Sequence, residues 1–238
     1  MSNRTFVVVA AYNEAERIAA TLDALARALP EARVLLADDG STDATAEIAA
    51  AHGAQVVGSP RMLGKGEAMT LAARAALALA RAEPTADRRE QAVFLLCDGD
   101  LAESAAALAA LVQAVERGEA ELAVAAFAQR IGGGFGLALG FARWAIRRRC
   151  GLQTRAPISG QRALGEAALQ DVLPFAHGFG MEIGMTIDAV RAGRRVVEIE
   201  LDLGHRAGGR TLAGFLHRGA QLADFARVYI ARGRLAAR

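Results

Sequence analysis

The 238-residue chain has few cysteines, a single lysine and a small net charge. Two cysteines, Cys97 and Cys150, are too few for a framework of bridges, and Cys97 falls in an apolar run where a small buried side chain is expected. Lys65 is the only lysine, and the formal net charge of +2 is too small to indicate a nucleic-acid-binding protein. We therefore expect neither a disulfide scaffold nor a nucleic-acid partner.

Long hydrophobic runs are also missing. The longest apolar stretch, 131–146, contains Arg143 and is shorter than the roughly 20 residues that a membrane-spanning helix needs. The first residues, MSNRTFVVVAA, lack the charged region and long apolar core of a signal peptide. Since 53% of the residues are hydrophobic and 23% are charged, the chain can bury a sizeable core. We expect a soluble cytoplasmic protein.

Short apolar runs and amphipathic segments alternate along the first half. FVVVAA at 6–11 is typical of a buried strand. Asn13, with Glu16 three residues later as in a capping box, is expected to cap the helix that follows. The alternation predicts an α/β fold, a mixed and mostly parallel sheet flanked by helices. Further strands are expected at 34–38, 55–57, 93–97 and 121–127, and further helices at 41–53, 64–81 and 104–117.

The second half is less regular and contains no linker long enough to separate two domains. An amphipathic helix is expected at 135–149, and PISGQRAL at 157–164 is interpreted as a strand. A helix at 181–192, a final strand at 195–201 and a C-terminal helix at 211–232 follow. We expect a single domain, 1–238.

Polar or glycine-rich segments follow four of the expected strands. They read AYNE, ADDGSTD, GSPRMLGKG and CDGD, and in open parallel sheets ligands bind at these carboxyl ends. No G-x-G-x-x-G follows the first strand, which excludes a dinucleotide fold. Gly58 and Gly64 are one residue too far apart for a P-loop, and Gly66 stands where its Ser or Thr would be.

ADDGSTD suits a nucleoside site, because a carboxylate at a strand end can accept hydrogen bonds from a base or from ribose hydroxyls. The alternative is a plain turn at Asp39–Gly40 with Ser41 as a helix cap. The second polar cluster, AYNE, follows the neighbouring strand and favours the nucleoside site.

LLCDGDL places two carboxylates, Asp98 and Asp100, two residues apart at the end of a buried strand. Two negative charges this close repel each other, and a bound divalent cation would neutralise this repulsion. Mg²⁺ or Mn²⁺ prefers oxygen ligands and is often bound by one or two carboxylates together with substrate phosphates. The motif therefore predicts a metal that bridges to a diphosphate.

Four segments, VVVAAYNEAERI, LLADDGSTDAT, LGKGEA and LLCDGDL, resemble in order and spacing the N-terminal half of family 2-type glycosyltransferases with the nucleotide-diphospho-sugar transferase (GT-A) fold. The resemblance implies that 1–130 binds the nucleotide sugar and the metal, and that 131–238 binds the acceptor. It implies nucleoside contacts from Tyr12, Glu14 and Asp39, donor contacts from Lys65 and Gly66, and metal ligands at Asp98 and Asp100.

GFGMEIGMTIDAVRAGRRVVEIELDLGHRAGGR resembles the corresponding stretch of glucosyl-3-phosphoglycerate synthases. This second resemblance implies that Glu182 faces the sugar and the acceptor and that His205 completes the metal site. Glu182 and Asp100 are accordingly the catalytic candidates. Arginines that suit an acceptor phosphate are Arg155, Arg162, Arg206 and Arg210.

IGGGFGLALGFARWAIRRRCGLQTRAPISGQRAL resembles polyprenyl-phosphate sugar transferases, in which such a helix lies near the membrane. We expect a metal-dependent glycosyltransferase that moves a sugar from a nucleotide-diphospho-sugar to a phosphorylated acceptor. A 3-phosphoglycerate-like acid and a polyprenyl phosphate at the inner membrane face are the alternatives for the acceptor. A non-catalytic nucleotide-sugar-binding protein is the rival from another class, and a homodimer is left open.

Overall fold

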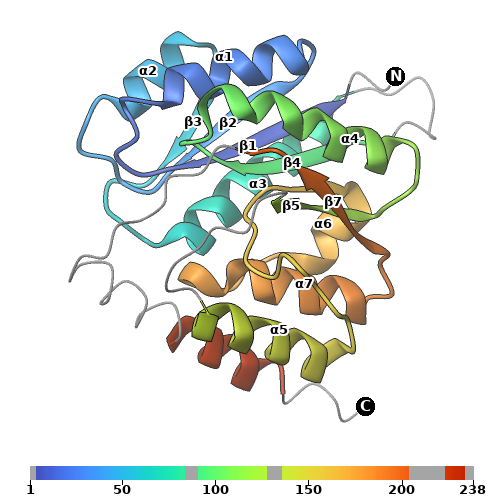
Figure 1. The fold of residues 1–238 in the computed structure, drawn as a ribbon. Coiled ribbons are helices and arrows are strands. Elements are labelled where there is room, and N and C mark those ends of the chain that lie inside the picture. The colour runs from blue at the N-terminus through green and yellow to red at the C-terminus, as the bar shows by residue number, and fades with distance from the viewer. Residues whose placement is uncertain (1–3, 84–90, 128–135, 204–222, 234–238) are drawn as a thin grey trace.

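The computed structural model describes residues 4–83, 91–127, 136–203 and 223–233. Its centre is a seven-stranded sheet in the order β3-β2-β1-β4-β6-β5-β7 (Figure 1). The strands are β1 (Thr5–Ala11), β2 (Arg33–Asp38), β3 (Gln55–Gly58), β4 (Val93–Asp98), β5 (Leu122–Phe127), β6 (Arg162–Gly165) and β7 (Val196–Leu201).

Most strand pairs of the sheet are parallel. β1 to β4 pair in parallel among themselves, as do β5 and β7, whereas β6 is antiparallel to both β4 and β5. The expected mixed, mostly parallel sheet is thus confirmed. β6 and β7 belong to the second half of the chain and lie in the same sheet as the first five strands.

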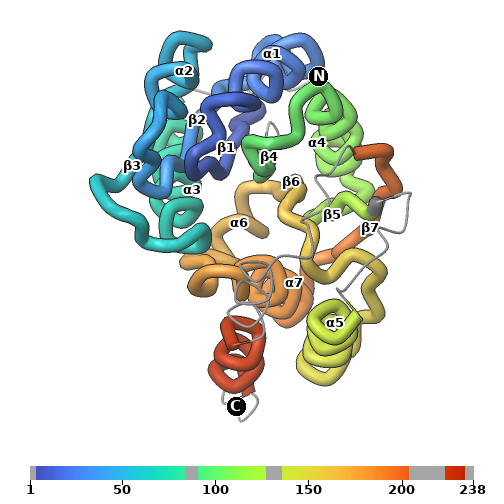
Figure 2. Tube along the Cα trace, turned by 60° about the vertical axis from the view of Figure 1, so that its left-hand side comes forward, coloured from blue at the N-terminus to red at the C-terminus, as the bar shows by residue number. Residues whose placement is uncertain are grey.

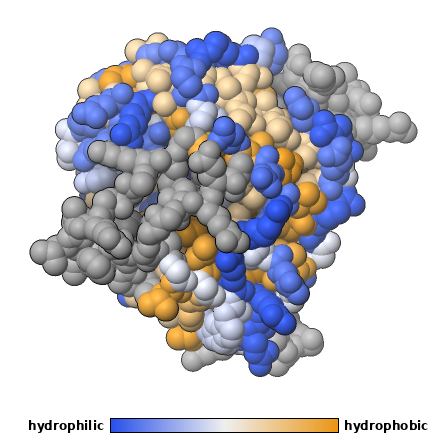
Figure 3. Space-filling view, in the orientation of Figure 1, coloured by the Kyte–Doolittle hydropathy of each residue, from blue (hydrophilic) through white to orange (hydrophobic). Residues whose placement is uncertain are grey.

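Helices cover both faces of the sheet. Next to one face lie α1 (Ile18–Ala28), α2 (Thr45–Ala51), the 3-10 helix η1 (Ala102–Leu108) and α4 (Ala109–Glu116). Against the other face pack α3 (Lys65–Ala82), α6 (Glu166–Val172) and α7 (Met181–Arg191). The alanine-rich outer surface of η1 and α4 forms a weakly hydrophobic area in the upper part of Figure 3.

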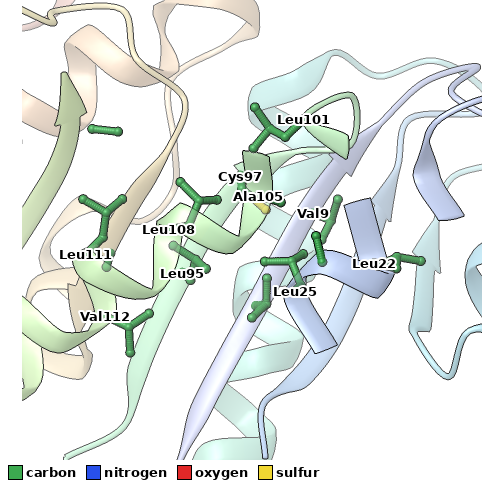
Figure 4. Close-up of a cluster of buried hydrophobic side chains, with 14 of the residues drawn as sticks. Val9, Leu22, Leu25, Leu95, Cys97, Leu101, Ala105, Leu108, Leu111 and Val112 are labelled. Carbon is green, nitrogen blue, oxygen red and sulfur yellow. The ribbon is translucent and has the colours of Figure 1, made fainter. Parts of the chain in front are cut away.

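Alternation along β1 divides its side chains between two cores. Val7 and Val9 point toward α1 and η1, while Phe6 and Val8 point toward α3. Figure 4 shows the first of these cores, where Leu22 and Leu25 of α1 lie beside Val9. Cys97 lies in that core, as expected for a small buried side chain, and burial raises the pKa of its thiol.

A further layer lies outside α7. It consists of α5 (Gly136–Cys150) and helical residues 223–231, and Figure 2 shows α7 between the sheet and these two helices. Ile183 and Ile187 of α7 pack with Ile146 of α5 and with Phe225 and Val228. None of the helices within the described ranges is long and apolar enough to cross a membrane.

Three local expectations are wrong. Asn13 does not cap α1, which begins at Ile18, because its backbone adopts a left-handed φ of 54° and its side chain bonds elsewhere. Residues 157–161 are not strand, since β6 begins only at Arg162. α6 was not expected at all, because a seven-residue helix is too short to show a clear period. The C-terminal helix expected from 211 lies outside the described residues up to 222.

Candidate active site

The candidate site lies at the carboxyl edge of the parallel strands. The strand register aligns Ala10 of β1 with Asp98 of β4, and Ala11 with Asp38 of β2. The segments that follow these three strands therefore begin at one edge of the sheet, where α/β proteins bind ligands.

Hydrogen bonds join the loop after β1 to the loop after β2. The Asn13 amide donates to Ser41 Oγ at 3.0 Å, and Asn13 Oδ1 accepts from the Thr42 amide at 2.8 Å. The Glu14 amide donates to Thr45 Oγ1 at 2.8 Å. AYNE and ADDGSTD thus form one rigid unit, and Tyr12 stays exposed on it with a ring available for stacking.

Asp39, expected to contact a nucleoside, also supports the next part of the site. Its Oδ1 accepts hydrogen bonds from the Leu63 amide at 2.7 Å and from the Gly64 amide at 3.0 Å. These bonds hold the segment that leads directly into Lys65 at the start of α3.

Lys65 lies between two carboxylates from distant parts of the chain. Its Nζ is 2.7 Å from Asp98 Oδ1 and 2.9 Å from Glu182 Oε1. Glu182 is in the first turn of α7 and only 5% exposed. Burial alone would lower the pKa of the Lys65 ammonium, but the charges of Asp98 and Glu182 outweigh burial and raise this pKa above its ordinary value. Lys65 therefore stays charged at neutral pH.

Gln161 and Gly160 complete the surroundings of Asp98. Gln161 Nε2 donates to Asp98 Oδ2 at 2.8 Å. A Cβ added at Gly160 would lie 2.9 Å from both Asp98 Oδ2 and Lys65 Nζ, so a larger residue here would force this ion pair to shift. Sequence reasoning missed both residues, because it placed them in a strand; the pairing needs two segments 63 residues apart.

The turn that carries Asp100 is held by Thr21 of α1. The Gly99 amide donates to the Ala10 carbonyl at 2.8 Å. Thr21 Oγ1 donates to the Gly99 carbonyl at 2.8 Å and accepts from the Ala102 amide at 2.8 Å. Thr21 is fully buried and shows no sequence signal beyond its helix position.

The sequence predicts a magnesium or manganese ion at this turn, where carboxylate oxygens are available as ligands. The described parts of the chain contain no group of three His, Cys, Asp or Glu side chains placed to hold a metal. However, Mg²⁺ usually binds one or two protein carboxylates and completes its shell with water and substrate phosphates. Asp98 and Asp100 offer such a pair. His205, the third ligand implied by resemblance, lies outside the described residues, as do Arg206 and Arg210.

The start of α3 packs closely against the segment before α7. A Cβ on Gly66 would lie 2.0 Å from the Ala176 carbonyl oxygen, and the Phe175 amide donates to Thr70 Oγ1 at 3.0 Å. The His177 ring also contacts the Glu67 carboxylate, and so joins the same two segments. The small size of Gly66 thus allows the close packing that brings α3, with Lys65, next to the segment before α7.

Gly66→Ala is expected to lower the free energy of unfolding by about 1–3 kcal/mol, because the added methyl group overlaps a backbone carbonyl. Urea unfolding measures the change. The matched control is Gly140→Ala in α5, where nothing lies within 4 Å of the added Cβ and helix propensity predicts a gain of about 0.5–1 kcal/mol. Equal effects at both positions would contradict the packing argument.

Two arginines considered for an acceptor phosphate have other surroundings. The Arg155 guanidinium lies 3.6 Å from Glu198 and 3.8 Å from Glu200. Arg162 is 0% exposed, because its place on β6 directs it between the sheet and α7. It therefore does not reach the surface, and the expectation that it binds a phosphate directly is wrong for this structure.

Known proteins resemble this chain over nearly its whole length. The model of glycosyl transferase family 2 matches residues 6–158. An uncharacterized glycosyltransferase of Mycobacterium tuberculosis is 34% identical over 227 residues, which are 93% of this chain and 96% of that protein. An uncharacterized glycosyltransferase of Mycobacterium bovis matches with the same identity and coverage.

Solved structures of glucosyl-3-phosphoglycerate synthase from Mycobacterium tuberculosis share the fold. The complex with Mg²⁺ and uridine-diphosphate has a TM-score of 0.73 at 27% identity and covers 96% of this chain and 78% of that one. The complex with Mn²⁺, uridine-diphosphate-glucose and phosphoglyceric acid has a TM-score of 0.71 at 26% identity and covers 96% and 79%.

Proposed function

This chain belongs to glycosyl transferase family 2, and we propose that it transfers a hexose from a nucleoside-diphospho-sugar to a small phosphorylated acceptor with the help of Mg²⁺ or Mn²⁺. Family membership confirms the glycosyltransferase and its GT-A fold. The donor, the metal and the acceptor are proposed because the solved relatives were crystallised with such molecules.

One observation supports the transfer most directly. Lys65 lies within 3 Å of both the expected metal carboxylate, Asp98, and the expected acceptor-side carboxylate, Glu182. In the reaction, negative charge develops on the departing nucleoside diphosphate. A fixed ammonium at the carboxyl edge of the sheet stabilises that charge with little reorganisation.

The donor half of the site follows from the same edge. Tyr12, Glu14 and Asp39 are proposed to bind the nucleoside, and Lys65 the diphosphate. Asp98 and Asp100 would hold the cation. When bound, the divalent ion supplies Lewis-acid neutralisation of the diphosphate.

Glu182 is proposed to orient the acceptor hydroxyl. In the transfer, the acceptor oxygen bonds to the anomeric carbon and the bond from that carbon to the diphosphate oxygen breaks, so the nucleoside diphosphate leaves with the electron pair. The acceptor proton passes to the departing diphosphate or to Glu182. Burial of this carboxylate at the start of α7 keeps it in one place for that task.

A lipid-linked acceptor is the second candidate, and one surface favours it. α5 exposes Leu137 (85%) and Trp144 (50%), and Arg147 and Arg148 follow on the same exposed face. No acidic residue occurs between Glu121 and Glu166. An apolar and cationic helix face of this kind suits an anionic membrane surface, where a polyprenyl phosphate would be found.

The test is release of nucleoside diphosphate from a panel of nucleotide sugars with Mg²⁺ or Mn²⁺. Three reactions are compared: no acceptor, 3-phosphoglycerate, and a short polyprenyl phosphate in vesicles. We expect 3-phosphoglycerate to stimulate release. Stimulation by the lipid alone would select the membrane-surface alternative. Tight donor binding without release in any reaction would contradict transfer and favour a nucleotide-sugar-binding protein.

A further inference from the structure

Arg162 is a buried cation that the proposed transfer does not yet use. It begins β6, which lies between β4 and β5 (Figure 2), and pairs in the register with Leu96 and Val124. Its side chain is fully buried, on the side of the sheet that α7 covers.

The guanidinium bonds to two segments of the candidate site. Arg162 Nε donates to the Ser159 carbonyl at 2.8 Å, and Nη1 donates to Thr186 Oγ1 at 2.9 Å. Thr186 Oγ1 in turn donates to the Glu182 carbonyl at 3.0 Å. Arg162 Nη2 is buried and has no hydrogen-bond partner among the described residues.

These two bonds lead toward the two carboxylate partners of Lys65, Asp98 and Glu182. Ser159 begins the turn in which Gly160 packs against Lys65 and Gln161 bonds to Asp98. Thr186 lies one helical turn after Glu182, the other partner of Lys65. Besides Lys65, Arg162 therefore connects the 159–161 turn on the Asp98 side with α7 on the Glu182 side.

Burial of this charge has a cost. Desolvation lowers the pKa of Arg162 to about 10, while the charges of Glu182 and Glu198 act to raise it. Arg162 is therefore still charged at neutral pH. Both hydrogen bonds of the guanidinium go to neutral oxygen atoms and not to a carboxylate, so they offset only part of this cost.

We propose that Arg162 is a positioning residue for sugar transfer, which holds the first turn of α7 and the 159–161 turn so that Glu182 and Asp98 face each other across Lys65. The inference rests on the proposed function of that site. Arg162 itself touches no substrate, and its effect passes through Ser159 and Thr186.

Arg162→Met tests the proposal, because it keeps the volume and removes both bonds and the charge. In this variant Glu182 still bonds to Lys65, and Glu198 still accepts hydrogen bonds from the amides of Arg155 and Ala156. The nearby carboxylates therefore retain partners, and the variant is expected to fold. A displacement of about 1 Å in a reacting group costs about 100-fold, and we expect kcat to fall by that factor with KM for the donor within about threefold.

Two further variants separate the charge from the bonds. Arg162→Lys keeps the positive charge but loses the planar guanidinium that donates two hydrogen bonds. Its kcat should be about tenfold higher than that of Arg162→Met. Thr186→Val removes only the bond toward Glu182 and should lower kcat by about fivefold. Because both act through one link, Arg162→Met combined with Thr186→Val should be no slower than Arg162→Met alone.

The matched control is Arg232→Met. Arg232 also bonds to α7, through Asp188 at 2.8 Å, but from the outer side of the helix. We expect this variant to lose stability with kcat within about twofold of the original chain, since it breaks an ion pair away from the reacting groups. An equal loss of kcat in both variants would overturn the proposal, as would full activity of Arg162→Met.

A second measurement needs no activity. Lys65 is the only lysine, so labelling with an amine reagent and peptide mass analysis reports this one side chain separately from the N-terminus. Arg162→Met should raise the labelling rate of Lys65 at least about threefold through local loosening of its partners, and Arg232→Met should not. If the original chain transfers no sugar, the proposed function fails, and the labelling rate of Lys65 alone tests the positioning role of Arg162. An unchanged labelling rate in Arg162→Met would overturn that role.

Discussion

Asp98→Asn and Asp100→Asn are each expected to reduce kcat/KM for sugar transfer at least about 100-fold. Each change removes one of the two carboxylates that we propose as ligands of the divalent cation. Asp98→Asn also removes the charge that faces Lys65 at 2.7 Å. Nucleoside diphosphate release as a function of Mg²⁺ and Mn²⁺ concentration measures both the loss and any change in metal requirement.

The matched control for these changes is Asp171→Asn. Asp171 forms an ion pair with Arg194 at 2.7 Å, and both side chains are partly exposed. Asp171 is distant in sequence from Asp98 and Asp100. A partly exposed pair contributes at most about 1 kcal/mol to stability, so we expect wild-type kcat/KM and an unchanged metal requirement. Metal-dependent transfer that persists in both Asp98→Asn and Asp100→Asn would show that the cation is bound elsewhere.

Lys65→Met is expected to lower kcat about 100-fold and to raise KM for the nucleotide sugar, because the only described cation between Asp98 and Glu182 is lost. The two carboxylates then face each other and the departing diphosphate without compensation. Initial rates at saturating and at low donor separate the two effects.

Arg74→Met on the same helix is the control for that change. Arg74 is exposed on α3, more than two turns beyond Lys65, and should leave both constants unchanged. Lys65→Arg keeps the charge in a different shape and should recover part of kcat. Wild-type turnover in Lys65→Met would exclude the ammonium from transition-state stabilisation.

Local patterns in the sequence predicted most of the framework. The β-branched run of β1 and the apolar run of β4 are typical of buried strands, and both form such strands in the structure. The polar segments after β1, β2 and β4 indicated the ligand edge, because parallel strands end at one side of a sheet. Local patterns gave wrong predictions where two loops form hydrogen bonds with each other. Asn13 resembles a helix cap in sequence, but its side chain accepts a hydrogen bond from the amide of Thr42, 29 residues later.

The sequence by itself determined the alternation of strands and helices, the polar strand ends and the candidate charges, since each depends on neighbours within a few residues. Only the tertiary structure decided which charges meet. Lys65 bonds to a glutamate 117 residues away and Gln161 to an aspartate 63 residues before it. Arg162, expected to suit an acceptor phosphate, is buried. β6 runs antiparallel between β4 and β5 and thereby inserts the 159–162 segment into the site. The physical reason is that hydrogen bonds and ion pairs act over a few ångströms in space, whatever the distance along the chain.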